Sequence, residues 1–81
     1  MFQRIGEKIE VAGVYRQAQF IPKKMKWRNR VYVVKQVTLC TDIKEGLVRK
    51  RMYSLMVDTT LYRIVFNRDT EVWMLEELWT E

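Results

Sequence analysis

Residues 47–66 read LVRKRMYSLMVDTTLYRIVF, and apolar or aromatic side chains occupy alternate positions on both sides of a polar Asp-Thr-Thr segment. A period of two is typical of a β-strand with one buried face. With Thr59-Thr60 as a two-residue loop, the opposing pairs are Val57–Tyr62, Leu55–Ile64 and Tyr53–Phe66. All six residues are apolar or aromatic, so both strands agree on which face is the core. The segment therefore predicts a β-hairpin.

A third strand continues the same pattern. The segment from Asn67 to Thr70 predicts a turn, which places Trp73 opposite Ile64 and Leu75 opposite Tyr62. Glu71 then lies opposite Phe66, beside the turn, and is the one charged residue among these opposing pairs. The residues that follow, 76–79, fit either a bulged strand end or a single helical turn.

A second hairpin is predicted upstream, between residues 23–27 and 30–34. Its turn is Arg28-Asn29, because asparagine tolerates the positive φ that a two-residue hairpin turn requires. Met25 then lies opposite Tyr32. The core face carries Met25, Trp27, Tyr32 and Val34, with Lys23 and Arg30 at its two ends. The other face carries Lys24, Lys26, Val31, Val33 and Lys35.

A further strand is expected over residues 8–15, where Ile9 and Val11 alternate with Glu10. The whole pattern predicts an all-β domain spanning residues 1–81. We expect a small curled antiparallel meander or SH3-like barrel of five to six strands, because an open sheet must protect its edges or curl.

Composition limits the function. The chain has 81 residues, 48% of them hydrophobic, with a net charge of +5, no histidine and one cysteine. These counts exclude an intrachain disulfide, a zinc finger and any histidine-based triad. Glycine loops for phosphate and metal-ligand clusters are absent from the sequence, so we expect no enzyme, no catalytic residue, no metal and no cofactor. Cys40 is expected to act as a small apolar residue.

The expected compartment is the cytoplasm. No apolar run approaches the roughly 20 residues of a membrane helix, and the start of the chain lacks the pattern of a secretory signal. A single free cysteine suits a reducing environment. No membrane association is expected.

Residues 22–34 fit the pattern Pro-x-x-apolar-x-Trp-Arg-Gly-x-x-Tyr-x-Val through Pro22, Met25, Trp27, Arg28, Tyr32 and Val34. With the later Tyr53, the Tyr62-Arg63-Ile64 segment and the closing residues 73–79, this pattern resembles a small bacterial all-β domain family of unknown function. Asn29 replaces the usual glycine, and residues 37–42 lack a second tryptophan that the family carries. Some members are appended to translesion-type DNA polymerases. The resemblance implies a small β domain with DNA-associated work and no catalytic residue.

Charge along the chain is uneven. Residues 23–51 hold ten basic and two acidic side chains, whereas residues 58–81 hold two basic and six acidic ones. A basic surface near aromatic side chains is how single-stranded nucleic acid is commonly held. The candidate nucleic-acid-binding residues are Lys23, Lys24, Lys26, Arg28, Arg30, Lys44, Arg49, Lys50 and Arg51. The alternative is that these charges form a solvated surface that keeps the sheet soluble.

A second candidate surface is apolar. Strand alternation places one set of residues on the face opposite the aromatic core: Met52, Met56, Leu61, Val65, Val72 and Met74. Either the N-terminal segment covers this face, or a protein partner or a second copy of the chain does. Of the three tryptophans, Trp27 and Trp73 are expected in the core and Trp79 is the freest to stack on a base. The sequence thus predicts a non-enzymatic binding module for nucleic acid, preferably single-stranded, with a protein adaptor or homodimer as the alternative.

Overall fold

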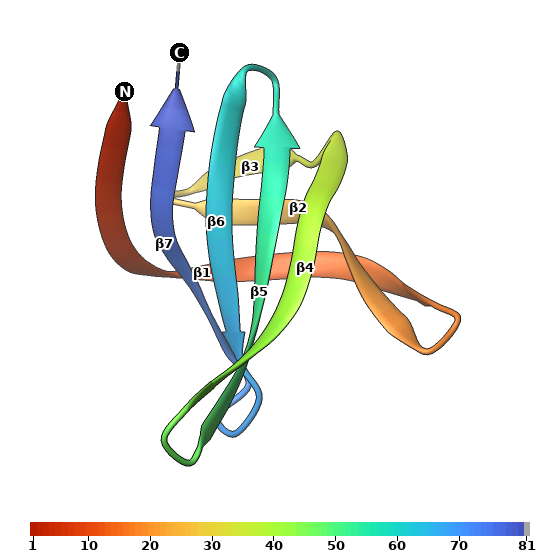
Figure 1. The fold of residues 1–81 in the computed structure, drawn as a ribbon. Helices are drawn as coiled ribbons and strands as arrows, with labels where there is room; N and C mark the ends of the chain where they lie inside the picture. The colour runs from red at the N-terminus through yellow and green to blue at the C-terminus, as the bar shows by residue number, and fades with distance from the viewer. Residues whose placement is uncertain (81) are drawn as a thin grey trace.

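The computed structural model describes residues 1–80, which form one antiparallel sheet of seven strands and no helix. The strands are β1 (Phe2–Arg16), β2 (Gln19–Trp27), β3 (Arg30–Val33), β4 (Gln36–Glu45), β5 (Val48–Val57), β6 (Thr60–Asn67) and β7 (Val72–Thr80). Their order across the sheet is β3-β2-β1-β7-β6-β5-β4 (Figure 1). The predicted all-β antiparallel fold is confirmed. No helix in this part of the chain is long and apolar enough to cross a membrane.

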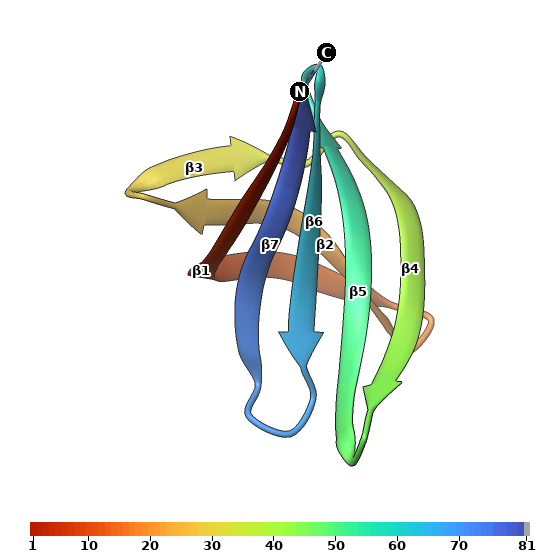
Figure 2. The same ribbon diagram turned by 60° about the vertical axis from the view of Figure 1, so that its left-hand side comes forward.

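The long strand β1 belongs to two layers that pack face to face. Its first half, residues 2–9, pairs with β7, and its second half, residues 10–16, pairs with β2. The register shifts between Arg4 and Glu7, and Gly6 in this bulge has a φ of 68°. A glycine adopts this left-handed backbone without a steric penalty, so the strand can bend there. We call residues 10–33 the small layer, and β4–β7 with the first half of β1 the large layer; their strands cross one another (Figure 2).

The segment Val34-Lys35 connects the two layers. The Val34 amide donates to the Lys23 carbonyl of β2, and the Lys35 amide donates to the Met56 carbonyl of β5, both at 2.9 Å. The edge strands β3 and β4 nevertheless do not pair, so the described sheet is not closed into a barrel. The expected SH3-like barrel is therefore not what the structure shows.

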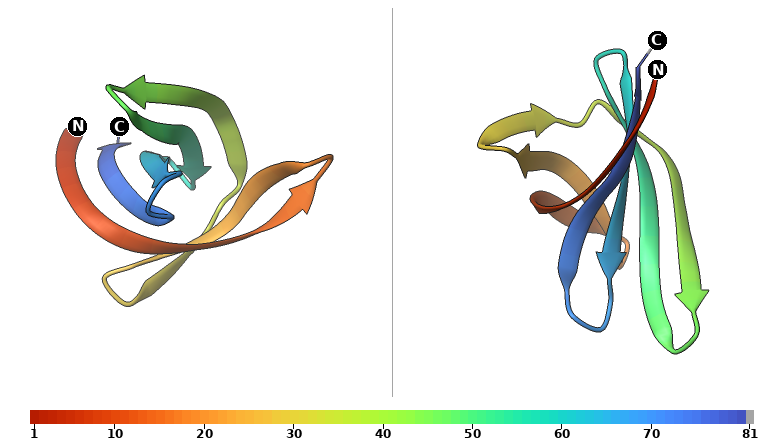
Figure 3. Two further views of the ribbon diagram at one scale, coloured as in Figure 1. Left: turned by 90° about the horizontal axis from the view of Figure 1, so that it is seen from below. Right: turned by 90° about the vertical axis from the view of Figure 1, so that its left-hand side faces the viewer.

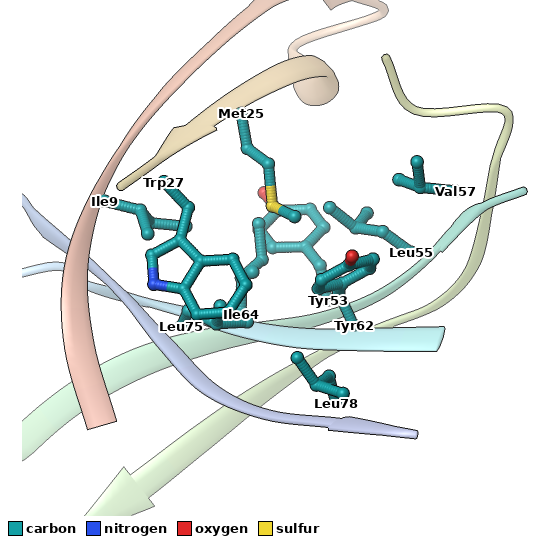
Figure 4. Close-up of a cluster of buried hydrophobic side chains, with 10 residues drawn as sticks. All are labelled: Ile9, Met25, Trp27, Tyr53, Leu55, Val57, Tyr62, Ile64, Leu75 and Leu78. Atoms are coloured by element: carbon teal, nitrogen blue, oxygen red, sulfur yellow. The ribbon is translucent and has the colours of Figure 1, made fainter. Parts of the chain in front are cut away.

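The core lies between the two layers (Figure 4). Met25 and Trp27 enter it from β2, while Tyr53, Ile64 and Leu75 enter from the large layer and are at most 2% exposed. The full cluster is Ile9, Met25, Trp27, Tyr53, Leu55, Val57, Tyr62, Ile64, Leu75 and Leu78. Burial of large aromatic and aliphatic side chains is the main favourable term in the stability of a domain this small.

The β2–β3 hairpin has the predicted register, with Met25 opposite Tyr32. Arg28 and Asn29 have φ values of 51° and 63°, as a two-residue primed turn requires. Of the two alternatives for residues 76–79, the structure shows the bulged strand end. β7 continues to Thr80 as a strand, with a register shift opposite Arg63 and Ile64.

Two other predicted registers are wrong by two residues. Val57 pairs with Thr60 rather than Tyr62, because the turn is Asp58-Thr59 and Asp58 adopts a φ of 53°. In the next hairpin Trp73 pairs with Phe66 rather than Ile64, because the loop extends to Glu71. A slip of two residues keeps every side chain on its predicted face, so the predicted core survives and Glu71 leaves it for the loop.

The predicted strand count and the first strand also need correction. Seven strands are present instead of five to six, and β1 begins at Phe2 instead of near residue 8. β1 is longer because its first half pairs with β7 along the edge of the large layer. For the same reason, the N-terminal segment extends the sheet and does not cover the apolar face, contrary to one of the two alternatives.

Candidate nucleic-acid interface

In the folded chain, the uneven distribution of charge along the sequence becomes a difference in net charge between the two layers. The small layer, residues 10–33, holds six basic side chains and one acidic side chain. The other described residues, 1–9 and 34–80, hold nine basic and eight acidic ones. The small layer therefore carries most of the net positive charge in less than a third of the chain, and a polyanion is attracted to that side first.

Ion pairing sharpens this difference. Within residues 1–80, ion pairs engage Lys35, Arg49, Lys50, Arg51 and Arg63 outside the small layer, but only Arg28 inside it. The basic residues of the predicted site that have no ion pair in this part of the chain are Lys23, Lys24, Lys26, Arg30 and Lys44. Four of these five belong to β2 or β3.

Lys24 and Lys26 lie on the outer face of β2, away from the core, as predicted. Lys24 lies between Ala12 of β1 and Val33 of β3, and Lys26 lies between Glu10 and Val31. The two valines are 59–61% exposed. The face is thus a flat strip in which two ammonium groups stand beside exposed aliphatic side chains. Glu10 is the one carboxylate in the strip.

Arg28, another predicted site residue, makes contacts within the fold. Its guanidinium donates to both carboxylate oxygens of Glu7, at 3.2 and 2.6 Å, and lies 4.6 Å from the centre of the Trp27 ring. The Trp27 indole N–H donates to the same carboxylate at 2.9 Å. The hydrogen bond from Arg28, followed by that from Trp27, holds the pKa of Glu7 below its ordinary value. Arg28 therefore covers the Trp27 ring and is bound, like that ring, to Glu7 of β1. This contact leaves Arg28 poorly placed to receive a phosphate.

The predicted residues of the β4–β5 hairpin form a separate cluster. Its turn lies far from the Arg28-Asn29 turn in both Figure 1 and Figure 2. Arg49 pairs with Asp69 at 3.4 Å, Lys50 with Glu45 at 3.0 Å, and Arg51 with Asp42 at 2.6 Å. The hydrogen bond from Arg51 lowers the pKa of Asp42. Strand alternation also places Lys50 on the outer face and its two arginine neighbours on the inner face. The nine basic residues predicted to bind nucleic acid therefore do not form one continuous patch.

The tryptophans differ in exposure. Trp27 is 9% exposed and Trp79 is 51% exposed, as the sequence predicted. Trp73 is half-buried rather than buried, because it lies at the open end of the sheet beside Phe66 and Phe20. The sequence analysis missed this aromatic group. Phe20 lies on β2, far along the chain from Phe66 and Trp73 on the consecutive strands β6 and β7. The local signal in the sequence was the closely spaced aromatic pair Tyr15 and Phe20 at one turn.

The six predicted interface residues all lie on the outer face of the large layer. Val65 is 4% exposed, because its neighbours cover it, and the others are half-buried. Three exposed residues that the prediction missed extend this face: Phe2, Leu39 and Trp79. A polar row crosses it, in which Arg63 forms an ion pair with Glu77, and Arg4 lies beside Glu77 on β1. This row divides the face into two apolar strips.

Residues 1–80 hold no group of three or more histidine, cysteine, aspartate or glutamate side chains that could bind a metal. Cys40 is exposed on the edge strand β4, whereas the sequence led us to expect an apolar setting.

Comparison of the chain with family models, with curated proteins and with solved structures found no match. The resemblance of residues 22–79 to a small bacterial β domain therefore stays a prediction.

Proposed function

We propose that the protein is a non-enzymatic binding module for single-stranded nucleic acid. The observation that carries the proposal is the concentration of basic groups that have no ion pair within residues 1–80 on the small layer. Lys24 and Lys26 stand on its outer face, and Lys23 and Arg30 lie at the two ends of the same hairpin, at positions that alternate to the face of Met25 and Trp27. Lysines and arginines that are already neutralised by carboxylates gain little from a phosphate, whereas these four release counterions from the nucleic acid when they bind.

A single strand suits this surface better than a duplex. The described residues contain no helix that could enter a major groove. A flat β-surface with exposed aliphatic side chains can instead follow a flexible backbone, with cations on the phosphates and apolar groups against unstacked bases. Val31 and Val33 provide such apolar groups beside Lys24 and Lys26.

The test is a fluorescence anisotropy titration of a labelled oligothymidine with two triple variants. Lys24→Gln/Lys26→Gln/Arg30→Gln removes three charges from the small layer, and we expect a loss of affinity of about tenfold or more at low salt. The matched control, Lys44→Gln/Arg49→Gln/Lys50→Gln, removes the same charge from the β4–β5 hairpin. Equal losses in both variants would mean that net charge alone matters, and would contradict the proposed surface.

A second candidate is a protein–protein adaptor or homodimer. It is favoured by the strip Phe2, Trp79, Leu61 and Met56, which runs across β1, β7, β6 and β5 on the outer face. Exposed aromatic side chains in an apolar strip are typical of protein interfaces.

Sedimentation equilibrium tests the homodimer. Met56→Glu should abolish self-association without unfolding the chain, whereas Val33→Glu, at an exposed apolar position on the small layer, should leave it intact. A parent protein that stays monomeric at high concentration would remove the homodimer and leave only a foreign protein as the partner.

A further inference from the structure

The open end of the sheet contains an aromatic hollow that the proposed lysine surface does not use. The tip of the β1–β2 hairpin projects there beyond the strands of the large layer (Figure 3). A hollow of about 200 Å³ lies between the hairpin and the inner face of β5–β7. We call it the aromatic mouth, and its principal residues are Tyr15, Phe20, Phe66, Trp73, Arg51 and Arg68.

The rings of the mouth pack on one another yet stay accessible. The centre of the Trp73 ring lies 4.7 Å from that of Phe66 and 5.6 Å from that of Phe20. Tyr15 meets Phe20 edge to face at 5.3 Å and is 78% exposed. Aromatic side chains deeper in the same face, such as Tyr53, are buried. The core therefore ends in a partly exposed aromatic wall, with Tyr15 the most exposed ring, on which a further flat ring can stack.

Two guanidinium groups stand beside this wall. Arg51 is held by Asp42 through two hydrogen bonds of 2.6 and 3.3 Å, so its orientation is fixed. Arg68 has no ion pair within residues 1–80, and its amide donates to the Arg49 carbonyl at 2.8 Å, which anchors its loop next to β5. With one carboxylate for two guanidiniums, the mouth favours an anionic ligand.

The backbone is built to hold the wall in place. A Cβ atom on Gly13 would lie 2.2 Å from the Ile21 carbonyl oxygen and 2.7 Å from Cζ of Phe20. Only glycine lets β1 pass this close to the Phe20 ring. The Tyr53 hydroxyl also donates to the Phe20 carbonyl at 3.5 Å, so the hairpin is tied to the large layer.

We propose that the aromatic mouth binds one nucleotide of a single strand, with its base stacked on Tyr15 and its phosphate facing Arg68. The proposal rests on the proposed nucleic-acid function and names its base-binding subsite. The hollow is smaller than the roughly 300–1,000 Å³ of sites for drug-sized ligands, so it admits one ring rather than several. Arg68, which has no ion pair within residues 1–80, favours this anionic occupant over a proline-rich peptide, which aromatic grooves also bind.

The first experiment compares oligothymidine with an abasic oligomer of the same length. Tyr15→Ala should weaken the binding of oligothymidine by about tenfold, within the usual range for one stacked base, and leave the abasic oligomer unchanged. Arg68→Gln should weaken both. The matched controls are Phe2→Ala and Arg4→Gln, which remove an exposed aromatic and an exposed arginine from the outer face, and both should bind the two oligomers as the parent does.

The outcomes separate this proposal from the proposed function. If the small-layer triple variant loses affinity while Tyr15→Ala binds both oligomers as the parent does, the mouth is overturned and the lysine surface stands. If Tyr15→Ala loses affinity while the triple variant does not, the lysine surface is overturned and the mouth stands.

A second measurement tests the mouth without an oligomer. Thymidine monophosphate at millimolar concentration, followed by NMR, should shift the indole N–H signal of Trp73 and leave that of Trp79 in place. No shift at Trp73, or displacement of the nucleotide by a polyproline peptide that binds the same hollow more tightly, would overturn the proposal.

Discussion

Gly13→Ala tests how the β1–β2 hairpin is seated on the sheet. An added Cβ would lie 2.2 Å from the Ile21 carbonyl oxygen, which belongs to the backbone and cannot rotate away. It would also lie 2.7 Å from Cζ of Phe20, a ring that packs on Trp73. Overpacking of this kind typically costs about 1–3 kcal/mol. For a domain of this size, each kcal/mol lowers Tm by roughly 4–8 °C.

The assay is urea denaturation followed by tryptophan fluorescence, with Gly46→Ala as the matched control. No atom lies within 4 Å of a Cβ at Gly46, but its φ is 60°. Alanine at Gly46 therefore adds only the strain of a left-handed backbone, about 1 kcal/mol, and no steric clash. Gly13→Ala should be the less stable variant and should also change the emission of the folded state, because Phe20 moves against Trp73. Equal stability of Gly13→Ala and the parent would refute the close contact and the seating of the hairpin that we derive from it.

Three further changes follow from the fold. Trp27→Ala should lower the free energy of unfolding by about 3–5 kcal/mol, measured by urea denaturation, and a loss below 1 kcal/mol would mean that the ring is not part of the core. Since the pKa values of Glu7 and Asp42 are lowered in the folded state, their stabilising effect is present at neutral pH and is lost as the pH falls through and below their lowered values. Urea midpoints measured below about pH 4, where free carboxylates begin to protonate, should therefore decrease, and by less in Glu7→Gln; an identical decrease would argue against the Arg28 contact. Glu71→Gly should raise Tm slightly, by the equivalent of up to about 1 kcal/mol, because Glu71 has a φ of 60°, and a lower Tm would contradict the strained turn.

The fold could be predicted where side-chain chemistry and backbone geometry agree. Asn29 indicated a primed turn, and the β2–β3 register followed from it. The later registers were missed because Asp58 and Glu71 adopt positive φ without being glycine or asparagine, and alternation cannot detect a slip of two residues. Closure could not be predicted either, because it depends on how far β1 bends at Gly6 and on whether β3 reaches β4.

The positions of the candidate residues in the fold could be predicted in part. The sequence correctly indicated a concentration of positive charge and an apolar outer face, since both follow from local composition and alternation. It could not show that Arg28 and Arg49 are neutralised by Glu7 and Asp69, because these partners are about 20 residues away in the chain. The aromatic mouth could not be predicted for the same reason, because Tyr15 and Trp73 are far apart in the sequence and line the same hollow only in the folded chain.

The salt dependence of oligonucleotide binding tests the central proposal most directly. Four phosphate contacts on the small layer predict a slope of about −3 for log affinity against log salt on a single strand. The variant Lys24→Gln/Lys26→Gln/Arg30→Gln should reduce this slope to about −1, and Lys44→Gln/Arg49→Gln/Lys50→Gln should leave it near −3. No detectable binding at about 50 mM salt, where phosphate contacts are still strong, or a slope that the first variant does not change, would contradict the account and favour a protein partner.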